Sequence, residues 1–180
     1  APARRIEVQH PNREPRRSEA ERPPEVLRLD PLRAVPHLDR DPRHAARGGF
    51  YVRYPVEGEL LEGLDDGRVS VGEGTLFEPG CWITMSREAR IEIGAGCFLN
   101  RGVMLAANER IEIGDHVMFA NGCFVGDSDH RYDDPDVPVT WQGFVSRGPV
   151  VIGSNCWFGV NCVVTGGVTI GDRAVVGANS

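Results

Sequence analysis

The chain has 180 residues, with 20 basic side chains, all of them arginine, and 26 acidic ones, which gives a net charge of −6 at neutral pH. This length suits a single domain, and the apolar runs of only a few residues are too short to cross a membrane. The charge excludes nucleic acid as the main ligand, because residues 51–180 carry 9 arginines against 18 acids and phosphate binding needs a concentrated basic surface.

The first fifty residues are a chain of a different kind. They hold 8 of the 13 prolines and no aromatic residue before Phe50. A segment with so few large apolar side chains cannot offset the entropy lost on its own ordering. We therefore expect an irregular Pro/Arg-rich extension over residues 1–50, largely disordered or draped on a domain over residues 51–180. A docking arm for a partner is the other interpretation of this extension.

From about Val71 the sequence follows a repeat of six. Position one is always a large aliphatic residue or Phe, position two is mostly Gly or another small residue, and position five is mostly small, as in Ile93-Gly-Ala-Gly-Cys-Phe98. Neither an amphipathic helix nor an alternating strand has this period, whereas a parallel β-helix makes one flat face from each hexapeptide. The repeat predicts an all-β parallel β-helix in which position-one side chains stack inside. Gly at position two suits a corner where a Cβ would be crowded or φ positive.

The five cysteines follow the same repeat. Each occupies position five of its hexapeptide: Cys81, Cys97, Cys123, Cys156 and Cys162. Their number is odd and no Cys-x-x-Cys pair exists, so we interpret them as small buried core residues in a reducing compartment. The polar first residues show no apolar core of a secretory signal, and we expect a cytoplasmic protein.

The repeat is interrupted at what should be a single corner of the coil. Uninterrupted coils are 18 residues apart, but the first two carry four and two extra residues. After Val125 the column resumes only at Ile152, so about 21 residues are inserted. In the interrupted units, position five is occupied by Arg87, Glu109 and Asp129. Solenoid proteins place such insertions on one face, often the binding face, and we predict a long protruding loop (about 131–151) beside the functional site.

His130 is the candidate catalytic residue at the start of this loop. The carboxylates of Asp129, Asp133 and Asp134 are close in sequence, and a carboxylate can fix an imidazole tautomer and stabilise its cation, as a general base requires. His116, at position four of a regular unit, should point to solvent. On spacing alone, a solvated turn with a chance histidine remains an equal interpretation of His130.

Three stretches resemble the hexapeptide-repeat acyltransferases with a left-handed parallel β-helix, and most closely their maltose, galactoside and polysaccharide O-acetyltransferase branch. They are Cys97-Phe-Leu-Asn-Arg-Gly-Val-Met104, the loop over 129–143, and residues 155–178. The resemblance implies a homotrimer that binds acetyl-CoA and an acceptor between subunits. It also implies acetyl transfer to a hydroxyl of a sugar, polysaccharide precursor or small metabolite, and requires no metal. The acceptor's identity, N-acylation and longer acyl groups stay open.

The resemblance also assigns roles by position. His130 matches the catalytic histidine, which would be the general base, and Asn100 matches an asparagine that contacts the acceptor. Asn108 stands where the sugar enzymes carry an acidic acceptor ligand. The positions that match the backbone lining of the CoA groove are Gly159, Val160 and Ala178.

Two other functions share this fold. A catalytically inactive assembly or scaffold module would keep the core column and lose the loop chemistry, and the presence of His130 with Asn100 argues against it. A gamma-class carbonic anhydrase holds zinc with three histidines, but the repeat offers only His116 and His130, and catalytic zinc usually needs three protein ligands.

Overall fold

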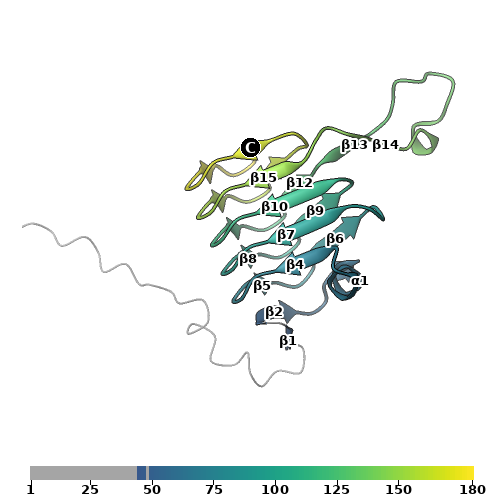
Figure 1. Cartoon of the computed structure of the whole chain (residues 1–180). Helices are drawn as coiled ribbons and strands as arrows, with labels where there is room; N and C mark the ends of the chain where they lie inside the picture. Colours follow the sequence, from purple (N-terminus) through teal and green to yellow (C-terminus); the bar gives the residue numbers. More distant parts are fainter. Residues whose placement is uncertain (1–43, 48) are drawn as a thin grey trace, which may run out of the picture. The chain divides into compact units, whose positions relative to one another are not determined.

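The computed structural model describes residues 44–47 and 49–180, so most of the predicted extension lies outside the described residues. The described chain winds through three sheets in turn (Figure 1). The first sheet consists of β1 (His44–Arg47), β2 (Phe50–Arg53), β5 (Leu76–Phe77), β8 (Phe98–Leu99), β11 (Met118–Phe119), β16 (Trp157–Phe158) and β19 (Val175–Val176). The second consists of β3 (Glu57–Gly58), β6 (Trp82–Met85), β9 (Met104–Ala107), β12 (Phe124–Gly126) and β17 (Val163–Val164). The third consists of β4 (Val69–Val71), β7 (Arg90–Ile93), β10 (Arg110–Ile113), β15 (Val150–Ile152) and β18 (Thr169–Ile170).

Within each sheet the strands pair in the register that the hexapeptide repeat predicts. The all-β parallel β-helix is therefore confirmed, in agreement with the left-handed hexapeptide coil. Successive parallel partners in the first sheet are the fully buried side chains Phe77, Leu99, Phe119 and Phe158. The rings of Phe119 and Phe158 stack with centroids 4.7 Å apart. Burial of each such side chain contributes about 1.5–3 kcal/mol, so this column is a main source of stability.

Crowding between coils explains glycine at position two. A Cβ on Gly94 would lie 2.6 Å from the carbonyl carbon of Gly114, and one on Gly114 would lie 2.8 Å from the nitrogen of Ser154. Left-handed φ values occur at position four instead, in Gly96 (65°), His116 (57°) and Asn155 (59°). The close approach of the next coil is thus the reason for glycine at these corners.

All five cysteines are buried and free, as the repeat predicts. Their thiols donate to carbonyl oxygens of the neighbouring coil, as from Cys97 to Gly114 at 3.1 Å and from Cys123 to Gly159 at 3.1 Å. Burial raises the pKa of the Cys81 thiol to about 12 and also raises the pKa values of Cys97 and Cys123. Such thiols are poor nucleophiles.

A partial coil precedes the first hexapeptide and was not expected from the repeat. β2 and β3 pair in parallel with β5 and β6, and β1 pairs antiparallel with β2. The helix α1 (Leu60–Asp66) follows and ends at Gly67, whose φ of 77° is left-handed. A Cβ on Gly63 would lie 2.4 Å from Cγ2 of Val69, so α1 packs tightly against the start of β4. None of the described helices is long and apolar enough to cross a membrane.

The three insertions lie at one corner, as predicted. They connect β6 to β7, β9 to β10 and β12 to β15, and each passes from the second sheet to the third. The longest forms an antiparallel pair, β13 (Ser128–His130) with β14 (Phe144–Ser146), and a short 3₁₀ helix, η2 (Val139–Trp141). We call residues 128–146 the arm, which extends from the stacked coils in Figure 1.

Candidate active site

His130 lies at the end of β13, where the arm leaves the coil. It pairs with Phe144 across the β13–β14 ladder, and the two rings lie 4.4 Å apart, centroid to centroid, with their planes tilted by 36°. Side chains alternate along a strand, so His130 and Ser128 face one side of the arm and Asp129 faces the other. The imidazole is exposed to solvent and packed on one side by an aromatic ring.

A cavity of about 200 Å³ lies between the arm and the second sheet, and we call it the coil cavity. It is lined by Thr84, Met85, Ser86, Ala106, Ala107, Asn108, Ser128 and Phe144. None of these side chains is charged, and four of them carry a hydroxyl or an amide. Because Phe144 contributes to the wall and also contacts the imidazole, His130 lies next to this cavity. The coil cavity can therefore bind a neutral group that carries hydroxyls.

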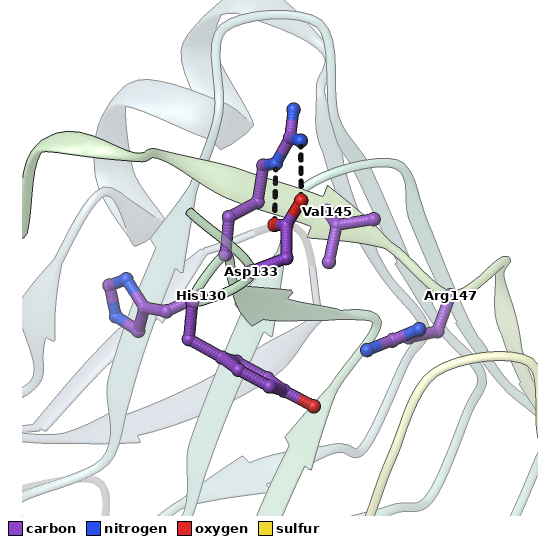
Figure 2. A pocket seen from close by; sticks show the side chains of 6 residues that line it. His130, Asp133, Val145 and Arg147 are labelled. Atoms are coloured by element: carbon purple, nitrogen blue, oxygen red, sulfur yellow. Dashed lines mark hydrogen bonds and ion pairs between the residues drawn. The ribbon is translucent and has the colours of Figure 1, made fainter. Parts of the chain in front are cut away.

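A second cavity of about 450 Å³ lies within the arm, and we call it the arm cavity (Figure 2). It is lined by His130, Arg131, Tyr132, Asp133, Val145 and Arg147. Arg131 donates two hydrogen bonds to Asp133, at 3.3 and 3.1 Å, and these bonds lower the pKa of Asp133. Two of the charged side chains in its wall, Arg131 and Asp133, are thus paired with each other.

The three carboxylates close to His130 in sequence each accept a hydrogen bond from another group. Asp129 accepts a hydrogen bond from Nε of Arg147 at 2.9 Å, and this bond raises the pKa of Arg147. Asp133 is bound to Arg131, and Asp134 accepts from the backbone N–H of Asp136 at 2.9 Å. Alternation along β13 directs Asp129 to the side of the arm opposite His130, and a role for these carboxylates in orienting the imidazole stays a prediction.

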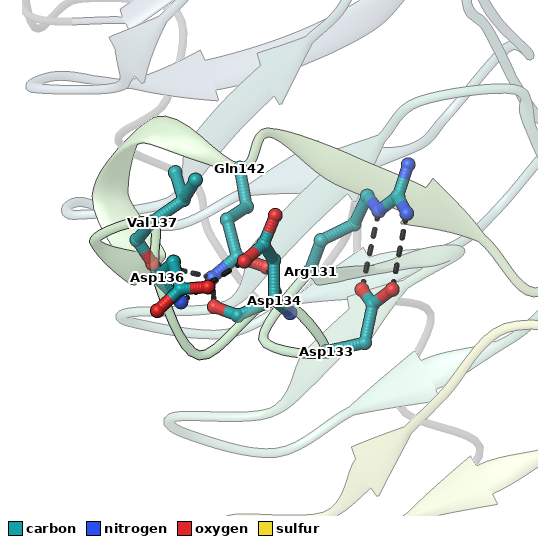
Figure 3. Close-up of polar contacts among 6 residues, drawn as sticks. All are labelled: Arg131, Asp133, Asp134, Asp136, Val137 and Gln142. Atoms are coloured by element: carbon teal, nitrogen blue, oxygen red, sulfur yellow. Dashed lines mark hydrogen bonds and ion pairs between the residues drawn. The ribbon is translucent and has the colours of Figure 1, made fainter.

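Gln142 closes the outer part of the arm (Figure 3). Its Nε2 donates to the carbonyl oxygens of Asp134 and Val137 at 2.8 and 2.7 Å, and its Oε1 accepts from the N–H of Asp134 at 3.1 Å. One side chain thus satisfies three backbone groups that no strand or helix pairs. The segment is therefore an ordered loop, in spite of its polar sequence.

Asp127 is a site residue that the sequence analysis missed. It is completely buried, and its two carboxylate oxygens accept from the backbone N–H groups of Asn108, Glu109 and Arg110 at 2.6, 2.7 and 2.6 Å. A polar residue directly after the last buried strand before the arm was the available signal. Asp127 fixes the turn that presents Asn108 to the coil cavity.

The residues with expected roles lie at two different corners of one chain. Asn108 and His130 lie at the corner between the second and third sheets. Four others lie between the first and second sheets, just after β8, β16 and β19: Asn100, Gly159, Val160 and Ala178. Gly159 is buried, and Val160 is 43% exposed with its carbonyl accepting from the N–H of Asn179. His116 is exposed at position four, as predicted.

Within residues 44–47 and 49–180, no three His, Cys, Asp or Glu side chains are placed to hold a metal ion together. The two histidines of the repeat lie at different corners, since His116 follows β10 and His130 ends β13.

Known proteins share both the repeat and the fold. A family described as the hexapeptide repeat of succinyl-transferase matches residues 149–180. A probable acetyltransferase of Mycobacterium tuberculosis is 37% identical over 111 residues, which cover 58% of this chain and 37% of the relative. The galactoside O-acetyltransferase of Escherichia coli is 30% identical over 132 residues, which cover 73% of this chain and 63% of that enzyme. The chain thus spans between about a third and two thirds of the length of these relatives.

A solved structure supports the same architecture. AntD, an N-acyltransferase from Bacillus cereus in complex with dTDP and 3-hydroxybutyryl-CoA, matches with a TM-score of 0.56 and 17% identity over 73% of this chain and 68% of that chain. This likeness shows a shared fold. Together with the buried hexapeptide columns and the relatives in sequence, it leads to one conclusion: the chain is a hexapeptide-repeat β-helix that is similar in sequence to proteins named as acetyltransferases.

Proposed function

We propose that the protein is an acetyl-CoA-dependent O-acetyltransferase in which His130 is the general base. The observation that carries the proposal is the position of the imidazole. It is exposed and packed against Phe144, which also forms part of the wall of an uncharged cavity with four hydroxyl or amide side chains. A base beside a pocket for a hydroxyl-bearing molecule is what acyl transfer to a hydroxyl requires.

The proposed step needs one proton acceptor. The acceptor's hydroxyl oxygen attacks the carbonyl carbon of the acetyl thioester while its proton passes to a ring nitrogen of His130. The tetrahedral intermediate collapses, the carbon–sulfur bond breaks, and the CoA thiolate takes the proton from the imidazolium. Backbone N–H groups would stabilise the oxyanion. No covalent enzyme intermediate is needed, and the buried cysteines are poorly suited to form one.

The division of the predicted residues between two corners supports a site shared by neighbouring subunits. Asn108 and His130 would come from one subunit, while Asn100 and the predicted CoA-groove residues Gly159, Val160 and Ala178 would come from another. The surface supports the same homotrimer. The outward side chains of the second sheet form the apolar row Trp82, Met104, Phe124 and Val163. Those of the first sheet form the apolar row Phe98, Met118, Trp157 and Val175.

These two rows contrast with the third sheet, where Glu92 and Glu112 are outward neighbours. Trp82, Trp157 and Val175 are 45%, 49% and 68% exposed in the single chain. Large exposed apolar surfaces mark interaction sites, and a homotrimer would bury such surface between its copies.

The relatives named as acetyltransferases support the acetyl group, and the galactoside enzyme supports a sugar hydroxyl as acceptor. The five free buried thiols support a reducing, cytoplasmic location. The alternative function, an inactive scaffold module, predicts the same coil and trimer without turnover.

An acceptor screen tests the proposal against this alternative. Purified full-length protein is incubated with acetyl-CoA and a panel of neutral sugars, hydroxylated metabolites and amines, and release of free CoA thiol is followed together with the mass of the product. We expect thiol release that depends on a hydroxylated acceptor. Thiol release with amines alone would favour N-acylation, and no release above background with any acceptor would favour the scaffold.

A further inference from the structure

The buried Asp127 holds more than one segment of the chain. Its carboxylate accepts three backbone N–H groups of the turn over residues 108–110, at 2.6–2.7 Å. Its own carbonyl oxygen accepts from the N–H of Arg147, in the residue after β14, at 3.0 Å. Its N–H donates to the carbonyl oxygen of Ala106 at 3.3 Å. One residue therefore connects the turn of one coil with the base of the arm in the next.

Packing around Asp127 leaves it little freedom to move. The residue is completely buried, and a Cβ on Gly166 would lie 2.5 Å from its carbonyl oxygen and 2.6 Å from Cβ of Arg147. The glycine is thus required where the following coil crosses Asp127 and the base of the arm. The carboxylate is consequently a fixed point on which the turn is placed.

The turn and the arm are the two sides of the coil cavity. Asn108 lines it from the turn, while Ser128 and Phe144 line it from the arm. A second link joins the two sides, because Oγ of Ser146 donates to Oε2 of Glu109 at 2.7 Å. The distance from the Asn108 amide to the Phe144 ring, and to the imidazole packed on it, is therefore set through Asp127.

We propose that Asp127 is a positioning residue that couples the turn bearing Asn108 to the arm bearing His130, and thereby determines how well the acceptor binds. This inference rests on the proposed function for its kinetic consequence, although the coupling itself does not. Both carboxylate oxygens act as acceptors, so an asparagine at this position could not replace it. Its amide NH₂ would face backbone N–H groups that then lose their acceptor in a buried site.

The experiment compares Asp127→Asn with Asp115→Asn. Asp115 is a matched control, since its Oδ1 also accepts a backbone N–H of the neighbouring coil, that of Ala95 at 2.8 Å, but at the third–first corner. Amide hydrogen exchange is resolved by NMR in both variants. We expect Asp127→Asn to speed exchange by about tenfold or more at residues 108–110 and at Arg147 together, because bonds to a charged group are lost. Asp115→Asn should leave these amides unchanged.

Faster exchange at residues 108–110 with Arg147 unchanged would overturn the proposal, because Asp127 would then only cap a local turn. If Asp127→Asn does not fold, amide hydrogen exchange of the wild-type protein tests the coupling instead. The amides of residues 108–110 and Arg147 should open with the same free energy, as parts of one cooperative unit. Opening at rates that differ by more than about tenfold would overturn the coupling.

Kinetics supply the second readout, with acetyl-CoA and methyl β-D-galactopyranoside as the probes. We expect Asp127→Asn to raise the KM for the galactoside by about tenfold while the KM for acetyl-CoA stays within about twofold. Equal changes in both constants would overturn the positioning role. If the wild-type protein does not acetylate this or any other acceptor, the proposed function fails, and hydrogen exchange still decides the coupling.

Discussion

The imidazole of His130 lies 4.4 Å from the ring of Phe144, and the same two residues face each other across the β13–β14 ladder. Backbone pairing therefore fixes the ring contact, which does not depend on a carboxylate partner. Phe144 also forms part of the coil-cavity wall, so one aromatic side chain both orients the proposed base and borders the space next to it.

Removal of the imidazole tests the proposed base. We expect His130→Ala to lower kcat by about 10²–10⁴-fold with an identified acceptor, because general-base catalysis contributes that much. Folding should be unaffected, since the side chain is exposed and its removal leaves no cavity in the core. The control is His116→Ala, which lies at an outward corner position. Near-normal turnover, or unfolding of His130→Ala, would contradict the assignment.

Removal of the ring tests the orientation of that base. We expect Phe144→Ala to lower kcat by about 10–100-fold, because misplacement of a catalytic group by about 1 Å costs that much. Circular dichroism should be unchanged, since Phe144 is 59% exposed. Val139→Ala, also in the arm but outside both cavities, serves as the control. Equal kinetics for the two variants would show that the ring contact has no catalytic role.

The core column should dominate stability. We expect Phe119→Ala to lower the free energy of unfolding by about 3–5 kcal/mol, because the ring is fully buried and stacked on Phe158. Thr169→Ala, on the exposed outer side of β18, should change it by less than about 0.5 kcal/mol. Chemical denaturation at neutral pH measures both, and similar losses would contradict a stability based on the stacked column.

The buried thiols should make stability fall at alkaline pH. Burial raises the pKa of Cys81 to about 12 in the folded chain, whereas an unfolded thiol titrates near 9.0. Between these values the unfolded state loses a proton that the folded state keeps, so the free energy of unfolding decreases as pH rises. Denaturation at several pH values between about 9 and 11 measures this decrease. The free energy of unfolding should fall less steeply with pH for Cys81→Ala than for wild type. Identical slopes would mean that Cys81 does not contribute.

The apolar outer rows should determine assembly. We expect Trp157→Glu or Trp82→Glu to convert a trimer into monomers, because either change would bury an unpaired charge at the interface. Light scattering coupled to size exclusion measures the mass. Glu112→Gln on the third sheet should leave the trimer intact. A monomeric wild-type protein would remove the shared-site arrangement altogether.

The coil could be predicted because its information is local and periodic. The register of Phe77, Leu99 and Phe119 follows directly from counting hexapeptides. The insertions follow from coil spacings longer than 18 residues. The partial first coil has no such period. There, β2 joins the first sheet through backbone bonds such as that from the N–H of Tyr51 to the carbonyl of Thr75, and its alternation of buried Phe50 and Val52 is too short to mark a coil.

At the site, the position of His130 at the start of the arm could be predicted, but its environment could not. Whether Asp129 faces the imidazole depends on strand alternation in β13, and a polar loop sequence does not reveal that this segment is a strand. Asp127 was missed for a related reason. Its three acceptor bonds reach residues 17–19 positions earlier, at a distance set by the coil.

The resumption of the coil after the arm has a consequence for how such proteins diversify. Ile113 and Ile152 are direct partners in the third sheet although the arm separates them in sequence. The pairing of these strands therefore does not depend on the length of the arm. The entropic cost of closing the loop rises only slightly with each added residue. Because the Gln142 side chain closes the tip by donating to the backbone carbonyls of Asp134 and Val137, residues 131–143 form an exchangeable segment. Such a segment can be lengthened or replaced without redesign of the fold that carries it.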